Sequence, residues 1–155
     1  MVDKTVLHLP LIGHLTKKIA AARFSRTLGS LLDNGVSMLS ALEIVKNIVG
    51  NAIISDTIED AAIEVGKGQG LGASFETSPV FPNLSIQMIR LGEQSGELET
   101  MLDKVADVYE NEVESTILGL TALLEPVMIL IMGVVVGFIV LAICLPIFEM
   151  NQLVM

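Results

Sequence analysis

The residue types that most often carry chemistry are few in this chain. Cys144 is its single cysteine, and His8 and His14 are its two histidines. One cysteine cannot form a disulfide within the chain, and these three residues lack the spacing of a zinc site. Cys144 also falls inside an apolar stretch, where a thiolate is disfavoured, and no serine stands in a pattern with a histidine that would activate it. We therefore expect a protein that is not an enzyme.

A glycine-rich run at residues 66–72 (GKGQGLG) is the one segment that resembles a nucleotide-binding motif. Gly68, Gly70 and Ala73 stand in a GxGxxA register. A dinucleotide fingerprint follows a strand, whereas this run follows a helical pattern, and the Walker pattern GxxxxGK[ST] is missing. We interpret the run as a loop and expect no organic cofactor.

Carboxylates are the most abundant ionisable groups. The chain has 18 Asp and Glu against nine Lys and Arg, for a formal net charge of −9. Because the basic residues are scattered, binding to nucleic acid is excluded. Within residues 97–114 the only base is Lys104, and the acidic residues are Glu97, Glu99, Asp103, Asp107, Glu110, Glu112 and Glu114.

These acidic residues fall on a long predicted helix and allow three interpretations. They could form a solvated helix face, a surface for a basic partner, or a site for a hard divalent cation such as calcium, which takes several carboxylate oxygens. For the partner-facing acidic stripe we single out Glu110, Glu112 and Glu114.

Residues 127–148 form an apolar segment without a charge or a polar amide. At about 1.5 Å per residue this segment extends about 33 Å, against roughly 30 Å of bilayer hydrocarbon. We predict one transmembrane helix in contact with membrane lipid. All nine basic residues precede it, which favours a cytoplasmic N-terminal side and a translocated tail at residues 149–155.

Two features mark this predicted span. Gly133 and Gly137 form a GxxxG pair, which either lets two helices approach closely or reflects the frequency of glycine in membrane helices. Glu125 and Pro126 stand at its start. Either Pro126 begins the helix and Glu125 lies near the positive end of its dipole, or the carboxylate lies in hydrocarbon at a cost of about 3 kcal/mol and makes a functional contact.

Apolar residues recur at helical spacing over the rest of the chain, and no stretch shows sustained alternation typical of a strand. Gly35, Gly50 and Gly96 stand where a glycine ends a helix. Ser37 and Ser40 are both candidate N-caps, Ser40 in a capping-box pattern with Glu43. The predicted helices cover residues 15–34, about 37–49, about 55–66, 84–95 and 97–124, with a short helical turn at 72–77.

These elements predict an all-α protein. We expect an antiparallel, cytoplasmic helical bundle at residues 1–124, whose last long helix continues into a single C-terminal transmembrane helix at residues 125–148, followed by the tail at 149–155. Pro146 is expected to interrupt helical hydrogen bonding near the far end of the span.

Four segments together carry a family resemblance. They are Phe24 to Gly35 (FSRTLGSLLDNG), Gly92 to Leu98 (GEQSGEL), Tyr109 to Glu112 (YENE) and the long segment from Leu123 to Val154. The sequence resembles the type II secretion system protein F family, the inner-membrane platform proteins of general secretion and type IV pilus machines. Such proteins typically have two copies of the helical domain and three spans. One copy and one span here resemble the C-terminal portion.

The resemblance implies a platform in the bacterial inner membrane that couples a cytoplasmic ATPase to fibre assembly and protein secretion. It implies several partners: the assembly ATPase, other inner-membrane secretion subunits, pseudopilins or pilins, and further copies of the same chain in a homo-oligomer. The recurrence of Glu-Pro in the family implies a functional role for Glu125 and Pro126. The alternative is an unrelated single-span membrane adaptor that tethers a soluble partner.

Overall fold

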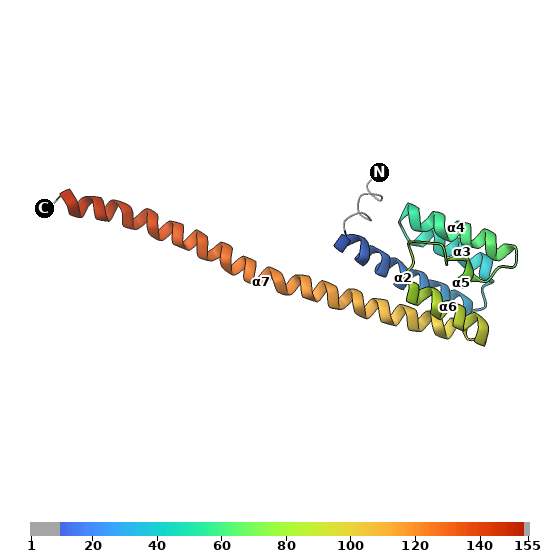
Figure 1. Cartoon of the computed structure of the whole chain (residues 1–155). Coiled ribbons are helices and arrows are strands. Elements are labelled where there is room, and N and C mark those ends of the chain that lie inside the picture. The colour runs from blue at the N-terminus through green and yellow to red at the C-terminus, as the bar shows by residue number, and fades with distance from the viewer. Residues whose placement is uncertain (1–9, 154–155) are drawn as a thin grey trace. The chain divides into compact units, whose positions relative to one another are not determined.

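The computed structural model describes residues 10–153 of the chain (Figure 1). His8 therefore lies outside the described residues, as do the last two residues of the expected tail. Within this range every regular element is a helix, which confirms the predicted all-α class. The helices are α2 (Pro10–Asp33), α3 (Met38–Ile48), α4 (Ala52–Gly66), α5 (Leu71–Ser74), α6 (Asn83–Ser95) and α7 (Leu98–Leu153).

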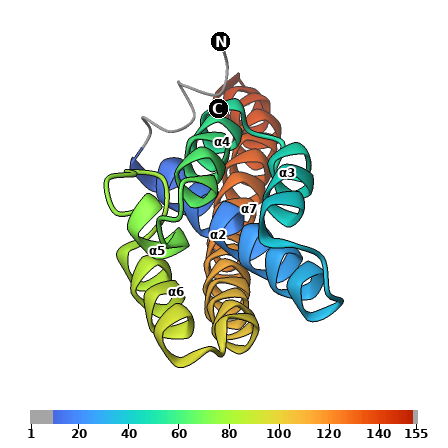
Figure 2. The ribbon, with the colours of Figure 1, turned by 90° about the vertical axis from the view of Figure 1, so that its right-hand side faces the viewer.

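The chain divides into two units, a helical bundle that ends at Glu114 and an apolar segment that begins at Ser115. The sequence-based boundary of the bundle was placed at residue 124. Helix α7 contributes its first turns to the bundle and the rest of its length to the apolar segment. In the bundle, each helix from α2 to α5 packs against the next one in the chain (Figure 2).

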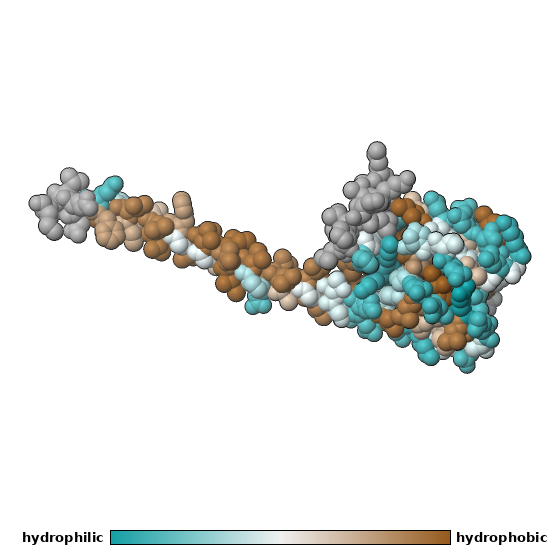
Figure 3. All heavy atoms as spheres, viewed as in Figure 1, coloured by the Kyte–Doolittle hydropathy of each residue, from teal (hydrophilic) through white to brown (hydrophobic). Residues whose placement is uncertain are grey.

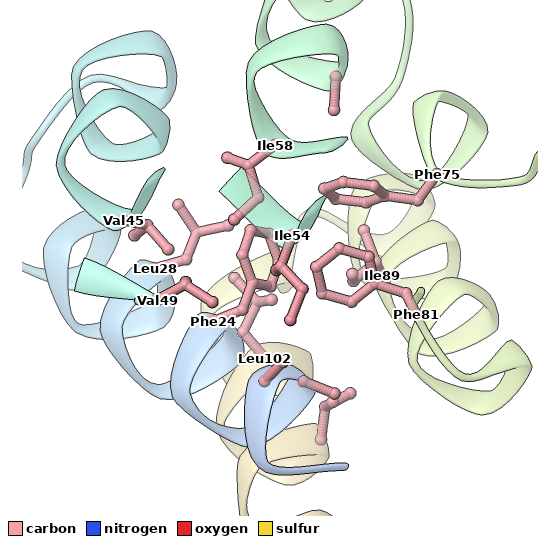
Figure 4. Packing of buried hydrophobic residues seen from close by; sticks show 14 of the residues in the cluster. Phe24, Leu28, Val45, Val49, Ile54, Ile58, Phe75, Phe81, Ile89 and Leu102 are labelled. Atoms are coloured by element: carbon pink, nitrogen blue, oxygen red, sulfur yellow. The ribbon is translucent and has the colours of Figure 1, made fainter. Parts of the chain in front are cut away.

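Three phenylalanine rings form the centre of the bundle's core (Figure 4). The ring of Phe24 lies 5.3 Å from that of Phe75 and 4.9 Å from that of Phe81, in edge-to-face arrangements that aromatic pairs favour. Aliphatic side chains from the other helices surround them, among them Leu28, Val45, Ile54, Ile58, Ile89 and Leu102. Buried residues from α2, α3, α4, α6 and α7 thus share one core.

Local capping explains where the first helices begin and end. Gly35 has φ 81° and the amide of Val36 donates to the carbonyl of Leu31 at 2.9 Å, so glycine ends α2 as predicted. Ser37 is the N-cap of α3, because its side chain accepts from the amide of Ser40. The alternative capping box at Ser40 is wrong, since Ser40 lies inside the helix.

The predicted start of the next helix near Ser55 is also wrong by about one turn. Asn51 accepts from the amides of Ile53 and Ile54, and α4 begins at Ala52. Asn51 is a typical N-cap residue, but the apolar spacing alone does not show where the capped helix begins.

Helix α7 runs without interruption through Pro126 and Pro146. Pro126 therefore does not begin a helix, which corrects that alternative for the start of the span. Helix α7 is described as far as Leu153 and includes residues 149–153, most of the expected tail.

Candidate interaction surfaces and the membrane helix

The sequence GEQSGEL forms the corner between α6 and α7. Gly96 ends α6 at φ 76°, and its amide donates to the carbonyl of Gly92. A Cβ atom on Gly92 would lie 2.8 Å from the Cα of Leu98 and 3.0 Å from the Cβ of Met101. Because a backbone atom cannot move aside cheaply, only glycine allows α6 to pack this closely on the start of α7. This motif builds a tight corner.

Glu93, in the same motif, holds α5 against α6. Its carboxylate accepts from the amide of Leu71 at 2.5 Å and from the amide of Gly72 at 3.0 Å. These are the first amides of α5, and a carboxylate satisfies them well. The glycine run thus directs two of its amides at a side chain of the same chain. A Cβ on Gly72 would lie 2.4 Å from the Cγ of Arg90, which makes this a close approach of two elements.

Arg26 of α2 binds three carboxylates of α7. Its guanidinium donates to Asp107 at 2.5 Å, to Asp103 at 3.3 Å and to both oxygens of Glu110 at 2.8 and 3.1 Å. These hydrogen bonds, first to Glu110 and then to Asp107, raise the pKa of Arg26 above its ordinary value. We call these four residues the Arg26 cluster. It places part of the predicted acidic stripe against α2.

The YENE sequence supplies further contacts within the bundle. Tyr109 is 4% exposed, and burial, followed by the charge of Glu112, raises the pKa of its phenol. Glu112 forms an ion pair with Lys18 at 2.8 Å. Glu110 and Glu112, two of the three residues predicted to face a partner, therefore make ion pairs inside the bundle.

The third residue, Glu114, is exposed, and within residues 10–153 the structure shows no ion pair for it. Glu99 and Glu114 flank the Arg26 cluster by about one helical turn on either side, because residues four apart share a helix face. The acidic stripe in the structure therefore differs from the predicted one: it consists of Glu99, Asp103, Asp107, Glu110 and Glu114, without Glu112, which pairs with Lys18. It carries five carboxylates and Arg26 neutralises only part of their charge.

The divalent-cation site that the sequence predicts would use these carboxylates of α7 as ligands. Among the described residues, no group of three or more His, Cys, Asp or Glu side chains is arranged to hold a metal ion. The guanidinium of Arg26 lies among Asp103, Asp107 and Glu110 instead. Calcium binding therefore stays a prediction, which no arrangement of the described side chains supports.

The apolar segment of α7 is uncovered along its length (Figure 3). Ile129, Leu130 and Phe138 are 67%, 69% and 74% exposed. Among the described helices, α7 is the one long and apolar enough to cross a membrane, and none of its most apolar stretch is buried by the chain. Because so much apolar surface is unfavourable in water, this segment suits insertion into a bilayer.

The predicted residues of the span lie on this uncovered helix. A Cβ on Gly133 or on Gly137 would meet no atom within 4 Å, so their backbone is open to a neighbouring helix. Glu125 and Pro126 lie in the middle of α7. The carboxylate of Glu125 therefore gains nothing from a helix N-terminus, and a functional role for these two residues stays a prediction.

A family model described as type II secretion system (T2SS), protein F matches residues 24–146 of the chain. The chain belongs to this family. The matched range begins at Phe24 and contains the corner motif, the Arg26 cluster and the apolar segment of α7 as far as Pro146. Lys18 lies outside it.

Two groups of relatives, named type IV pilus assembly proteins and type II secretion system proteins F, match almost the whole chain. A type IV pilus assembly protein PilC from Thermus thermophilus is 43% identical over 150 residues, which are 96% of this chain and 37% of that protein. A PilC from Pseudomonas aeruginosa is 40% identical over 98% of this chain and 41% of its own length. A type II secretion system protein F from Pseudomonas aeruginosa is 42% identical over 96% of this chain and 37% of its length. The protein F family chain thus spans about two fifths of these relatives.

The contacts of Arg26 and Glu93 were not predicted from the sequence. Arg26 is 77 to 84 residues from its three partners, and Glu93 is 22 residues from Leu71. A signal was present in both cases: each residue belongs to a segment that carried the family resemblance. The resemblance marked these segments as typical of the family, but it did not show which residues Arg26 and Glu93 contact.

Proposed function

We propose that this chain is part of an inner-membrane platform that couples a cytoplasmic ATPase to the assembly of pilin-like subunits into a fibre, in type IV pilus assembly or type II secretion. Family membership and the names of its relatives support the proposal. The observation that carries it is α7, one helix that contributes an acidic stripe to the bundle and an apolar segment suited to a membrane.

The proposed role is organisational rather than catalytic. The names of the relatives describe assembly and secretion. Membership in this family removes the alternative of an adaptor unrelated to secretion or pilus assembly. By the distribution of basic residues, we propose that the bundle lies in the cytoplasm and that several copies assemble in the membrane.

The acidic stripe is the surface that we propose for the ATPase. Its carboxylates favour a basic partner, and charge complementarity between exposed groups increases the rate of encounter. Since Glu110 and Glu112 are held by Arg26 and Lys18, reversing either charge also disturbs the bundle. Glu114 offers the cleanest test because it is exposed and its charge is not used within the described bundle.

The experiment measures binding of the cognate assembly ATPase to the full chain in lipid nanodiscs. We expect Glu114→Lys to weaken binding by about three- to tenfold at low salt, and the effect to shrink as salt screens the charges. Asp33→Lys is the matched control, because Asp33 is also exposed and lies at the end of α2. Equal affinities of the two variants at low salt would remove the stripe as the ATPase surface.

A further inference from the structure

A groove between α3 and α4 is a second candidate surface, separate from the acidic stripe. It encloses about 240 Å³. Leu42 and Ile58 are fully buried at its floor, and Leu39 and Ile63 line it with half of their surface exposed, at 49% and 53%. We call it the α3–α4 groove. We propose that it binds a basic amphipathic helix of a partner protein.

The apolar part of the groove is suited to the apolar face of a helix. Leu39 of α3 and Ile63 of α4 stand on opposite sides, so a side chain entering between them would contact both helices. A partner helix that presents aliphatic residues at positions i, i+3 or i+4, and i+7 places them in one row, as a groove requires. Filling the groove would remove the exposed surface of Leu39 and Ile63 from water.

The charges around the groove select a basic partner. From Met38 to Lys67 the chain has five carboxylates and two lysines. Lys46 is shared at 3.4 and 3.6 Å between Glu43 and Glu59, both of which line the groove. One lysine between two carboxylates leaves a negative rim.

The exposed face of α4 beside the groove carries further negative charge. Asp56 and Asp60 are exposed, and within the described part of the chain no ion pair offsets them. Lysines or arginines that flank the apolar row of a partner helix would meet these carboxylates and the rim.

The same charges disfavour the other occupants. A membrane surface rich in anionic lipid would be repelled by the rim. A second copy of this chain could associate through other surfaces, but its described residues offer no basic helix to the groove. Its exposed or half-exposed bases that lack an ion pair in the described range, Lys17, Arg23 and Lys104, do not form one row on a helix.

The test uses the full chain in nanodiscs of zwitterionic lipid, and an 18-residue synthetic helix with a leucine row flanked by lysines as the labelled probe. Fluorescence anisotropy measures binding, with empty nanodiscs subtracted. We expect Leu39→Ser and Ile63→Ser each to weaken binding by about tenfold. Glu59→Gln should weaken it by about threefold at low salt.

Leu84→Ser is the matched control. Leu84 on α6 has the same exposure as Leu39, 49%, but its neighbours on the exposed face, Asn83 and Gln87, are uncharged. We expect this variant to bind the probe as the unchanged chain does. Circular dichroism and thermal unfolding of every variant separate a lost surface from a lost fold, and Ile63→Ser provides a second variant if Leu39→Ser unfolds.

Two control probes complete the design. One replaces each lysine by glutamate, and the other keeps the composition but distributes the leucines around the helix. The proposal expects neither to bind. The proposal is overturned if Leu39→Ser and Leu84→Ser lower the affinity for the probe equally. It is also overturned if the glutamate probe binds as well as the lysine probe, or if the chain forms dimers that depend on Leu39. Since Glu114 takes no part, Glu114→Lys should bind the probe normally even if the ATPase proposal fails.

Discussion

At the scale of residues, the contacts of Arg26 change the interpretation of the acidic charge on α7. Asp103, Asp107 and Glu110 would repel one another on a bare helix, since they recur on one face. Arg26 from α2 donates to all three. Three carboxylates of the acidic stripe are therefore bound by Arg26 within the bundle. Glu99 and Glu114 are the members of the stripe that Arg26 does not bind.

Arg26→Ala should lower the free energy of unfolding by about 1 kcal/mol, because exposed ion pairs contribute little individually and more in a network. The effect should shrink when salt is raised to about 0.5 M, at which charges on the surface are screened. Chemical unfolding of the full chain in detergent micelles, followed by circular dichroism, measures it.

Arg23→Ala is the control for the Arg26 variant, because Arg23 is exposed on the same helix and has no ion pair within residues 10–153. Arg26→Lys should recover less than half of the loss, since an ammonium cannot donate to several carboxylates in the geometry of a guanidinium. If Arg26→Ala and Arg23→Ala unfold alike, the cluster does not stabilise the bundle.

At the scale of elements, the corner between α6 and α7 is the part most tightly determined by side-chain size. Gly92 brings α6 onto the start of α7, and Glu93 next to it binds the first amides of α5. Two consecutive residues therefore position three helices. This accounts for the GEQSGEL segment as a structural motif.

Gly92→Ala should destabilise the bundle by about 1 to 3 kcal/mol, because the added methyl group would overlap the backbone of Leu98. Gly66→Ala is the control: it is also helical, and its Cβ would meet only the end of the Leu39 side chain at 3.9 Å, an ordinary contact. Thermal unfolding compares the two. A Gly92→Ala chain as stable as the Gly66→Ala chain would show that the corner can relax.

The sequence predicted most elements because their signals are local. Gly35 and Gly96 end their helices where glycine was expected to, and the apolar spacing located the core face of α2 at Phe24 and Leu28. The predicted start of α4 was wrong, and so was the alternative in which Pro126 begins a helix, whereas the prediction that the last long helix continues into the span is confirmed. A proline removes one hydrogen bond but does not end a long helix whose other bonds remain, and this balance is not visible in spacing.

The contacts between distant residues were beyond local reasoning for a different reason. Nothing near Arg26 in the sequence indicates that α7 will lie within reach of it, and Glu93 could equally have faced solvent. Helical periodicity shows which face is apolar, but it does not say which other helix will face a given polar residue.

At the scale of the whole molecule, the apolar segment of α7 is uncovered and offers its surface to lipid or to other helices. Among the described residues from Ser115 onward, no hydrophobic side chain is buried within the chain. With no hydrophobic force between helices in lipid, close packing at small residues drives their association. Gly133 and Gly137 are open for such packing.

Gly137→Leu should weaken association of the chain in lipid vesicles by about tenfold, because a large side chain separates helix backbones that glycine brings together. Energy transfer between donor- and acceptor-labelled chains measures the association. Val135→Leu is the control, since Val135 is 52% exposed and, two residues from each glycine, lies on the opposite side of the helix. A Cβ at residue 137 meets nothing in its own chain, so a weaker signal would report on contacts between chains. Equal energy transfer in the two variants would mean that this face of α7 is covered by lipid alone.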